Sequence, residues 1–313
     1  MDPEVSIVIP AYNEEEALPH LLERLAEILP QIPPAEVLIV DDGSTDGTPE
    51  ILKDSVKRYP WLRVLILRRN FGQSAALTCG LDHARGKILV TLDADLQNDP
   101  ADIPKLLDKL KEGYDLVSGW RKNRQDPFFT RKLPSRVANA LISRITGVRL
   151  HDYGCTLKAY RREALQGVTI YGELHRFIPV LADLRGARIA EVPVRHHPRR
   201  FGKSKYGLSR TYRVLLDLLL MFFFQRFATR PLHFFGLPGG LLFGTGFLIE
   251  LYLSFLKIFG HQQIGHRPLL LLGVLLILTG INLVCTGLLA ELIMRAYYEG
   301  SGRRTYALRE ILP

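Results

Sequence analysis

The sequence predicts an α/β domain with a doubly wound sheet, followed by an apolar C-terminal region that crosses a membrane twice. Two observations predict this architecture. Up to about residue 120, short apolar runs alternate with segments in which apolar residues recur every three or four positions. From residue 230 to residue 295, the chain is almost wholly apolar. Alternating strands and helices form sheets with right-handed crossovers, and such sheets bind ligands beyond the carboxyl ends of their strands.

The strands of the first region are short and rich in β-branched residues, as buried parallel strands are. We expect them at Val5–Pro10, Val37–Val40, Arg63–Leu67, Ile88–Leu92 and Leu116–Gly119. We expect the helices between them, at Glu14–Leu29, Thr48–Tyr59, Gln73–Ala84 and Ala101–Glu112. Residues 1–207 are assigned to this domain.

The apolar region contains two stretches long enough to cross a bilayer. Residues 236–256 carry one charge, Glu250, and residues 268–290 carry none. A membrane helix needs about 20 apolar residues, and neither stretch has the polar face of a helix that lies on a soluble core. We therefore interpret residues 230–295 as a transmembrane hairpin.

The flanking segments predict how the hairpin is oriented. Residues 208–229 mix basic and apolar side chains, which is typical of an amphipathic helix at the membrane surface. More basic residues follow the second stretch than lie in the hairpin loop: Arg295, Arg303, Arg304 and Arg309 against Lys257 and Arg267. The positive-inside bias therefore places the α/β domain, both termini and the tail at residues 296–313 in the cytoplasm, on a cell (inner) membrane.

Composition narrows the choice of partners. The net charge is +9, and basic residues cluster at 121–136 and 195–213, which favours phosphate or an anionic lipid surface. Because these clusters adjoin a membrane segment, we do not expect nucleic acid. The cysteines Cys79, Cys155 and Cys285 form no CxxC pair, which argues against a zinc site or a disulfide framework.

Small residues in the first apolar stretch suggest self-association. Five glycines would allow close helix packing, at Gly236, Gly239, Gly240, Gly244 and Gly246. A homo-oligomer is therefore an open prediction.

The most informative motif is TLDADLQ, in which a predicted buried strand ends near Asp93 and Asp95 follows two positions later. Alternation along an extended backbone would place both carboxylates on one side. Two converging carboxylates suit Mg²⁺ or Mn²⁺ that bridges a diphosphate. Taken alone, the pair would more often be a solvated acidic loop.

Two further strand ends meet at the same edge of the predicted sheet. Asp41 and Asp42 close one strand, and Pro10, Tyr12 and Glu14 follow another. Tyr12 would lie against a base, while Asp42 or Glu14 would accept hydrogen bonds from a base or ribose. Each could instead be a cap or loop residue, but together they predict one concave binding edge.

These motifs resemble a known family. The series SIVIPAYNE, VDDGSTDGT, RNFGQSAAL and LDADLQNDP is similar to the family 2 glycosyltransferases with a GT-A fold, which is a Rossmann-like mixed sheet. The later motifs RVANALISRITG, DYGCTLKAYRR, ELHRFIP and HHPRRFGKSKYG resemble the polyprenyl-phosphate branch of that family. That branch includes dolichol-phosphate mannose synthase and bacterial undecaprenyl-phosphate glucosyltransferases. The motifs cover about residues 4–210.

The resemblance implies roles for the residues that match. The nucleoside would be held by Pro10, Tyr12, Glu14 and Asp42. The metal and the diphosphate would be held by Asp93, Asp95 and Gln97. The acceptor phosphate would be bound by Arg121, Arg131 and Ser135, although lipid headgroups are an alternative partner for the two arginines. Asp152 would lie near the sugar and orient the sugar hydroxyls or the acceptor rather than act as an obligatory base, and a structural cap is an equal alternative.

The resemblance also implies that the loop Arg200–Tyr206 folds over the phosphates of nucleotide and lipid. Its polar members are Arg200, Lys203, Ser204 and Lys205. A glycine beside cations would let such a loop move and bring positive charge to a diphosphate. The alternative is a solvated basic surface loop.

The expected reaction is inverting transfer of a hexose from a nucleotide-sugar to polyprenyl (undecaprenyl) phosphate, with UDP-glucose favoured and GDP-mannose next. The second pKa of a phosphate monoester is about 6, so the acceptor is already ionised. The protein would then act by positioning and by stabilising the departing diphosphate.

Two alternatives belong to other classes. One is a non-catalytic nucleotide-sugar sensor or flippase subunit, which would not need an intact metal motif. The other is a processive polysaccharide synthase, but residues 225–227 do not match the QxxRW motif of those enzymes. Two membrane helices are also too few for a channel.

Overall fold

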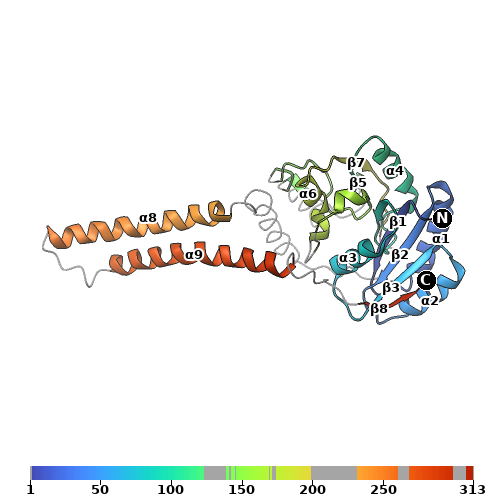
Figure 1. The fold of residues 1–313 in the computed structure, drawn as a ribbon, viewed down its shortest axis with the longest axis horizontal. Helices are drawn as coiled ribbons and strands as arrows, with labels where there is room; N and C mark the ends of the chain where they lie inside the picture. The colour runs from blue at the N-terminus through green and yellow to red at the C-terminus, as the bar shows by residue number, and fades with distance from the viewer. Residues whose placement is uncertain are drawn as a thin grey trace. The chain divides into compact units, whose positions relative to one another are not determined.

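The computed structural model describes residues 2–122, 139–140, 142–144, 146–168, 170, 174–198, 231–259, 268–298 and 308–312. The chain divides into two compact units (Figure 1). The first unit consists of Met1–Leu218 and Arg304–Pro313, and the second of Leu219–Arg303.

The described part of the first unit is built on a mixed sheet of eight strands in the order β7-β5-β6-β4-β1-β2-β3-β8 (Figure 1). The parallel half consists of β1 (Val5–Ala11), β2 (Ala35–Asp41), β3 (Leu62–Leu67) and β4 (Ile88–Thr91). The rest consists of β5 (Leu116–Trp120), β6 (Lys158–Arg161), β7 (Ile189–Pro193) and β8 (Leu308–Leu312). Strand β6 is antiparallel to both β4 and β5, β7 is parallel to β5, and β8 is antiparallel to β3.

Helices cover both faces of this sheet. They are α1 (Leu18–Ile28), α2 (Thr48–Arg58), α3 (Gln73–His83), α4 (Ile103–Lys111) and the short α6 (Ile178–Asp183). On one face, the apolar sides of α1, α2 and α4 pack against alternate residues of β1, including Ile7 and Ile9. On the other face, α3 lies so close to the sheet that a Cβ on Gly80 would be 3.1 Å from Val40 Cγ2. The prediction of a doubly wound sheet is therefore confirmed.

Every strand and helix expected before residue 120 is present, with small shifts at the ends. The largest shift is at the first helix, which we expected to begin at Glu14 and which begins at Leu18. The Glu14 carbonyl accepts hydrogen bonds from the backbone N–H groups of Ala17 (3.1 Å) and Leu18 (3.0 Å), so a turn precedes the helix. Pro19 follows in the first turn, where its missing N–H costs nothing.

The second unit is a pair of packed helices, α8 (Pro231–Ile258) and α9 (Pro268–Tyr298). They contain both stretches that the sequence predicts to span a membrane. The segments Pro238–Ile258 and Pro268–Thr286 are long and apolar enough to do so, and only 11% of each is buried. A core helix of a soluble protein would be mostly buried, so the helices are candidate membrane spans.

Glycines bring the two helices into backbone contact. A Cβ on Gly246 would lie 2.6 Å from the Gly273 carbonyl oxygen, and one on Gly239 would lie 2.8 Å from that of Gly280. A Cβ on Gly240 or Gly244 would meet nothing within 4 Å. Gly239 and Gly246 therefore serve the hairpin itself, and self-association stays a prediction.

The amphipathic helix expected at residues 208–229 lies outside the described residues. Within the described part of the hairpin, Glu250 Oε1 is buried with no hydrogen-bond partner. It lies against the backbone of Gly273.

Candidate active site

The carboxyl ends of β1, β2 and β4 lie at one edge of the sheet and carry the acidic motifs. Such an edge is where open α/β sheets bind ligands. The loops after β1 and β2 are joined through Asn13, whose φ is +52°. Its backbone N–H donates to Ser44 Oγ at 2.9 Å, and its Oδ1 accepts from the N–H of Thr45 at 2.8 Å. Sequence reasoning missed Asn13, although asparagine tolerates positive φ better than most residues.

Asp42 fixes the loop that leads into α3. Its Oδ1 accepts from the N–H of Phe71 at 2.8 Å, and its Oδ2 from that of Gly72 at 2.9 Å. Burial nevertheless raises the pKa of Asp42 above its usual value. Pro10, Tyr12 and Glu14, the other three residues predicted to hold a nucleoside, are all partly exposed at this edge. Their contact with a nucleoside stays a prediction.

Asp93 and Asp95 are brought together by a turn and not, as we expected, by strand alternation. Strand β4 ends at Thr91, and Leu96 has a φ of +58°. Asp93 Oδ1 accepts a hydrogen bond from Gln73 Nε2 (2.8 Å), and Asp95 Oδ1 accepts one from the backbone N–H of Gln97 (3.1 Å). Burial and the negative charge of Asp95 raise the pKa of Asp93 to about 7.

The chemistry of this carboxylate pair fits a divalent cation. A cation between the two groups would remove the repulsion that raises the pKa of Asp93. Among the described residues, no cluster of three or more His, Cys, Asp or Glu side chains is present. The diphosphate of a bound nucleotide would supply further oxygen ligands. The contribution of Gln97 stays a prediction.

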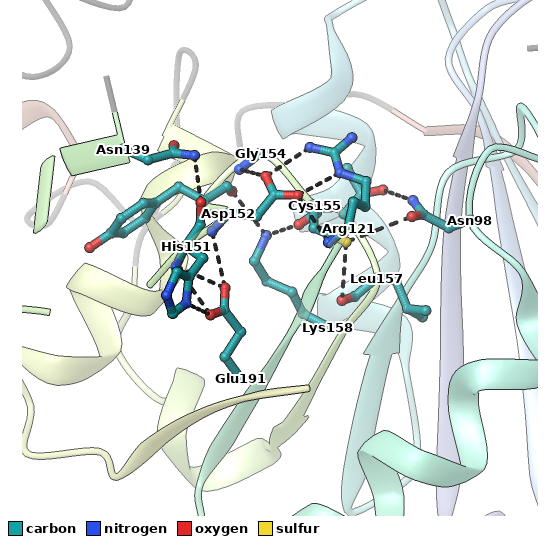
Figure 2. A network of polar contacts seen from close by, with 12 residues as sticks. Asn98, Arg121, Asn139, His151, Asp152, Gly154, Cys155, Leu157, Lys158 and Glu191 are labelled. Carbon is teal, nitrogen blue, oxygen red and sulfur yellow. Dashed lines mark hydrogen bonds and ion pairs between the residues drawn. The ribbon is translucent and has the colours of Figure 1, made fainter. Parts of the chain in front are cut away.

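Arg121 and Asp152 form a buried, bidentate ion pair (Figure 2). The charge of Arg121 acts on Asp93, so the pair lies near the carboxylates. Arg121 Nε donates to Asp152 Oδ2 at 2.6 Å, and Nη2 donates to Oδ1 at 2.9 Å. The two side chains are only 11% and 7% exposed. Burial alone would lower the pKa of Arg121, but the hydrogen bonds and charge of Asp152 raise it. Arg121 is therefore a fixed cation at this site.

Lys158 lies on β6, opposite Thr91 of β4. Figure 2 shows its side chain close to Asp152 and Cys155. Its Nζ donates to the carbonyl oxygens of Tyr153 (3.4 Å) and Cys155. Burial lowers the pKa of Lys158 and raises the pKa of the Cys155 thiol to about 11. Cys155 is therefore a neutral thiol at neutral pH.

The chain that leaves β7 is tied to the carboxylate loop. The His197 N–H donates to the carbonyl oxygen of Gln97 at 2.9 Å. Arg195 Nη1 lies 3.3 Å from Asp99 Oδ2, and the Arg195 N–H donates to Asp102 Oδ2 at 2.6 Å. This anchored segment precedes the basic loop at residues 200–206.

The structure thus places Asp93, Asp95, Arg121 and Asp152 in one electrostatic cluster. Six predicted site residues lie outside the described part of the chain: Arg131, Ser135, Arg200, Lys203, Ser204 and Lys205. Sequence reasoning missed Gln73 and Lys158 as neighbours of the carboxylates. Gln73 lies in the motif RNFGQSAAL and Lys158 in DYGCTLKAYRR. A glutamine or a lysine in such a motif does not by itself predict a contact across the sheet.

Comparison with known proteins agrees with this geometry. Residues 6–169 match the model of Glycosyl transferase family 2. The chain is 49% identical over 313 residues to the dodecaprenyl-phosphate galacturonate synthase of Rhizobium johnstonii, covering 98% of this chain and 93% of the relative. It is 39% identical over 311 residues to the undecaprenyl-phosphate 4-deoxy-4-formamido-L-arabinose transferase of Pseudomonas paraeruginosa, covering 98% and 90%.

Solved structures share the fold. Glucosyl-3-phosphoglycerate synthase from Mycobacterium tuberculosis, in complex with Mn²⁺, UDP and phosphoglyceric acid, has a TM-score of 0.55 at 22% identity. The match covers 70% of this chain and 78% of that one. The same enzyme in complex with Mn²⁺ and UDP-glucose has a TM-score of 0.55 at 21% identity, with 70% and 79% covered. The similarity supports a GT-A-like arrangement of the sheet and its helices.

Proposed function

Because the chain belongs to glycosyl transferase family 2, in its polyprenyl-phosphate branch, we propose that it transfers a uronic acid from a nucleotide donor to a polyprenyl phosphate. The observation that carries this proposal is the juxtaposition of a carboxylate pair, Asp93 and Asp95, with a fixed cation, Arg121. The carboxylate pair suits a divalent cation bound to a nucleoside diphosphate, and Arg121 suits the phosphate of a lipid.

The donor sugar that we propose differs from the one that the sequence favoured. The two relatives are named for galacturonate and for 4-deoxy-4-formamido-L-arabinose, and neither sugar carries the C6 hydroxyl of glucose. We take galacturonate as the leading donor because its relative is 49% identical along nearly the whole chain. We propose UDP as the nucleotide of the donor. UDP-glucose and GDP-mannose serve as control donors in the transfer assay.

Asp93 and Asp95 would hold Mg²⁺ or Mn²⁺, with Gln97 as a further oxygen donor. The cation would neutralise charge on the departing diphosphate. The pKa of about 7 at Asp93 supports this assignment, because it reflects loss of hydration first and the negative charge of Asp95 second, and a cation would offset both. Gln73 would keep Asp93 in place through its 2.8 Å hydrogen bond.

The acceptor phosphate would attack the anomeric carbon from the face opposite the departing diphosphate, so that the configuration inverts. The phosphate has a second pKa of about 6 and needs no side chain to remove a proton. Arg121 would hold a phosphate oxygen near that carbon. Asp152 would orient Arg121, because its carboxylate already accepts both guanidinium hydrogen bonds and one from the Gly154 N–H at 3.1 Å.

The hairpin α8–α9 would span the membrane and hold the enzyme at the surface where the lipid phosphate lies. The chain leaves the first unit to form the hairpin and then returns to that unit as β8. This path supports two crossings, with the catalytic unit and both termini on the same side. The basic residues near the chain's end favour the cytoplasmic side.

The test is a transfer assay with the full-length protein in detergent or vesicles. Undecaprenyl and dodecaprenyl phosphate would each be offered with labelled UDP-galacturonate, UDP-glucose, UDP-4-deoxy-4-formamido-L-arabinose and GDP-mannose, with Mg²⁺ or Mn²⁺ and with a chelator. We expect label from UDP-galacturonate to enter the organic phase, and the chelator to abolish this transfer. Transfer from a different donor would overturn the sugar assignment, and transfer from none would overturn the lipid-acceptor assignment for these substrates.

A further inference from the structure

Glu191 holds the loop that carries Asp152. Strand β7 pairs in parallel with β5, and Glu191 of β7 lies opposite Ser118 of β5. Glu191 is therefore on the strand next to the one that leads to Arg121. Its side chain is only 10% exposed. Figure 2 shows its carboxylate turned toward His151 and the start of Asp152.

The carboxylate of Glu191 meets two backbone donors and one ring. The His151 N–H lies 3.0 Å from Oε1 and 3.1 Å from Oε2, and the Asp152 N–H donates to Oε1 at 3.0 Å. His151 Nδ1 lies 2.7 Å from Oε2. Charge-assisted bonds of this kind are stronger than neutral ones. Consecutive N–H groups of one loop therefore converge on one carboxylate.

The same loop is held from its other side. Lys158 Nζ binds the carbonyl oxygens of Tyr153 and Cys155, and Asn139 Nδ2 donates to the His151 carbonyl oxygen at 2.7 Å. With its backbone held in this way, the loop presents the Asp152 side chain to Arg121 in a bidentate geometry. A bidentate pair tolerates little displacement, because both hydrogen bonds depend on the relative plane of the two groups.

We propose that Glu191 is a positioning residue for the transfer reaction, which sets the place of Asp152 and, through it, the orientation of the Arg121 guanidinium. This inference rests on the proposed function, in which Arg121 binds the acceptor phosphate. In this proposal Glu191 acts through the loop of Asp152 and does not itself bind a substrate. Its effect is therefore felt in steps that need Arg121 and not in the binding of the nucleotide.

Two variants of Glu191 and one control carry the test. Glu191→Gln keeps one carbonyl oxygen but turns an NH₂ group toward a backbone N–H, and Glu191→Ala removes both acceptors. The matched control is Glu36→Gln, on β2. Glu36 is also buried and also accepts a backbone N–H, that of Arg85 at 2.6 Å, but it lies near the start of its strand, away from the site.

The kinetic experiment is a double-mutant cycle between Glu191→Gln and Asp152→Asn. A misplacement of about 1 Å costs on the order of 100-fold in rate, so we expect Glu191→Gln to lower kcat/KM for the acceptor by about 10- to 100-fold. In the Asp152→Asn background, the same change should cost less than about 2-fold, because residues that act as one unit are not additive. The Kd of the nucleoside diphosphate should change by less than about 2-fold.

A second readout does not depend on activity. Hydrogen exchange of the peptide that contains His151 and Asp152 should lose protection in both Glu191 variants and keep it in Glu36→Gln. Unchanged protection, additive effects in the cycle, or an equal loss of acceptor kinetics in Glu36→Gln at the same melting temperature would overturn the role of Glu191. If the wild-type protein transfers no sugar to polyprenyl phosphate, the proposed function fails, and hydrogen exchange still decides whether Glu191 holds the loop.

Discussion

Asp93 stands out at the scale of single residues, because its carboxylate is partly buried and lies next to another acid. Its pKa rises to about 7 from an ordinary value of 3.8, first through burial and then through the charge of Asp95. A nearby cation stabilises the ionised form of such a carboxylate, and burial without a cation destabilises it. A proton and a divalent cation would therefore compete for Asp93 near pH 7.

This competition predicts how metal binding depends on pH. Below about pH 7, Asp93 carries a proton that the metal must displace, so the Kd for Mn²⁺ should rise by about tenfold for each unit of pH decrease. Above that pH, the Kd should level off. Calorimetric titration of the wild-type protein between about pH 5 and 8 measures this dependence. Asp93→Asn should bind weakly at every pH, and a wild-type Kd that is constant below pH 7 would contradict the assignment.

The raised pKa of Asp93 also determines how its contribution to the free energy of unfolding changes with pH. Because the pKa of Asp93 is higher in the folded protein than in the unfolded one, the folded state holds its proton more tightly. The contribution of Asp93 to stability therefore falls as pH rises from about 4 through about 7. A bound cation would oppose this loss, and most strongly at the upper end of that range.

Sequence alone could predict part of the site at this scale. Asp93, Asp95 and Asp42 follow strands whose apolar runs are plain, so their shared edge was predictable. The pairing of Arg121 with Asp152 was not, because the two residues are 31 positions apart and belong to motifs with separate expected roles. Glu191 gave no signal at all, since a lone acid in a strand is typical of a solvated edge.

At the scale of elements, the C-terminal strand β8 is the feature that the sequence analysis missed. Its five residues follow a basic segment, and we treated residues 296–313 as a tail. In the structure, β8 pairs with β3 at the edge of the sheet, and Leu312 packs against the core. A strand this short carries too few residues for a periodic pattern, and its partner lies more than 240 positions away in the chain.

The pairing of β8 predicts an alternating response to proline. In an antiparallel edge strand, successive N–H groups point alternately toward the neighbouring strand and toward solvent. Of Glu310→Pro and Ile311→Pro, one should therefore lose a ladder hydrogen bond and destabilise the catalytic unit by about 1–3 kcal/mol. The other should be much milder. Thermal unfolding of the two variants, beside Glu310→Ala and Ile311→Ala, makes the comparison, and two equal proline effects would argue against the pairing.

The contact between α8 and α9 makes a second prediction at this scale. A Cβ on Gly246 would lie 2.6 Å from the Gly273 carbonyl oxygen, whereas one on Gly244 would meet nothing within 4 Å. Gly246→Ala should therefore push the helices apart and cost about 1–3 kcal/mol, the usual cost of overpacking. Gly244→Ala should be neutral or slightly stabilising, because alanine is the better helix former. Unfolding in detergent measures both, and equal stabilities would contradict the backbone contact.

The strands and helices before residue 120 were predictable because each is amphipathic or continuously apolar and is bounded by glycine, proline or acid. β6 and β7 were not predicted. Each has only four or five residues, and β7 is half-buried along most of its length. Their places in the sheet depend on pairing with β4 and β5, which is a property of the assembled fold and not of the local sequence.

For the whole molecule, the decisive feature is the path of the chain. It builds the α/β unit, forms a hairpin of two candidate spans, and then comes back to add β8 to the sheet that it left. An even number of crossings is the arrangement that lets the chain return to the same sheet without threading a strand through the bilayer. The positive-inside bias favours the same arrangement from independent residues, since the basic side chains after α9 outnumber those in the hairpin loop.

This path predicts which positions an impermeant thiol reagent can reach. In spheroplasts of a bacterium that expresses the protein, His261→Cys in the hairpin loop should react, whereas Glu4→Cys and Ser301→Cys should react only after permeabilisation. The wild-type protein is the control. Cys79 and Cys155 are buried, and Cys285 lies in a candidate span, so none of the three should react. If His261→Cys and Ser301→Cys become accessible under the same condition, the hairpin does not cross the bilayer. If Glu4→Cys reacts in intact spheroplasts and His261→Cys does not, the orientation is reversed, and the lipid phosphate must be met on the outer face instead.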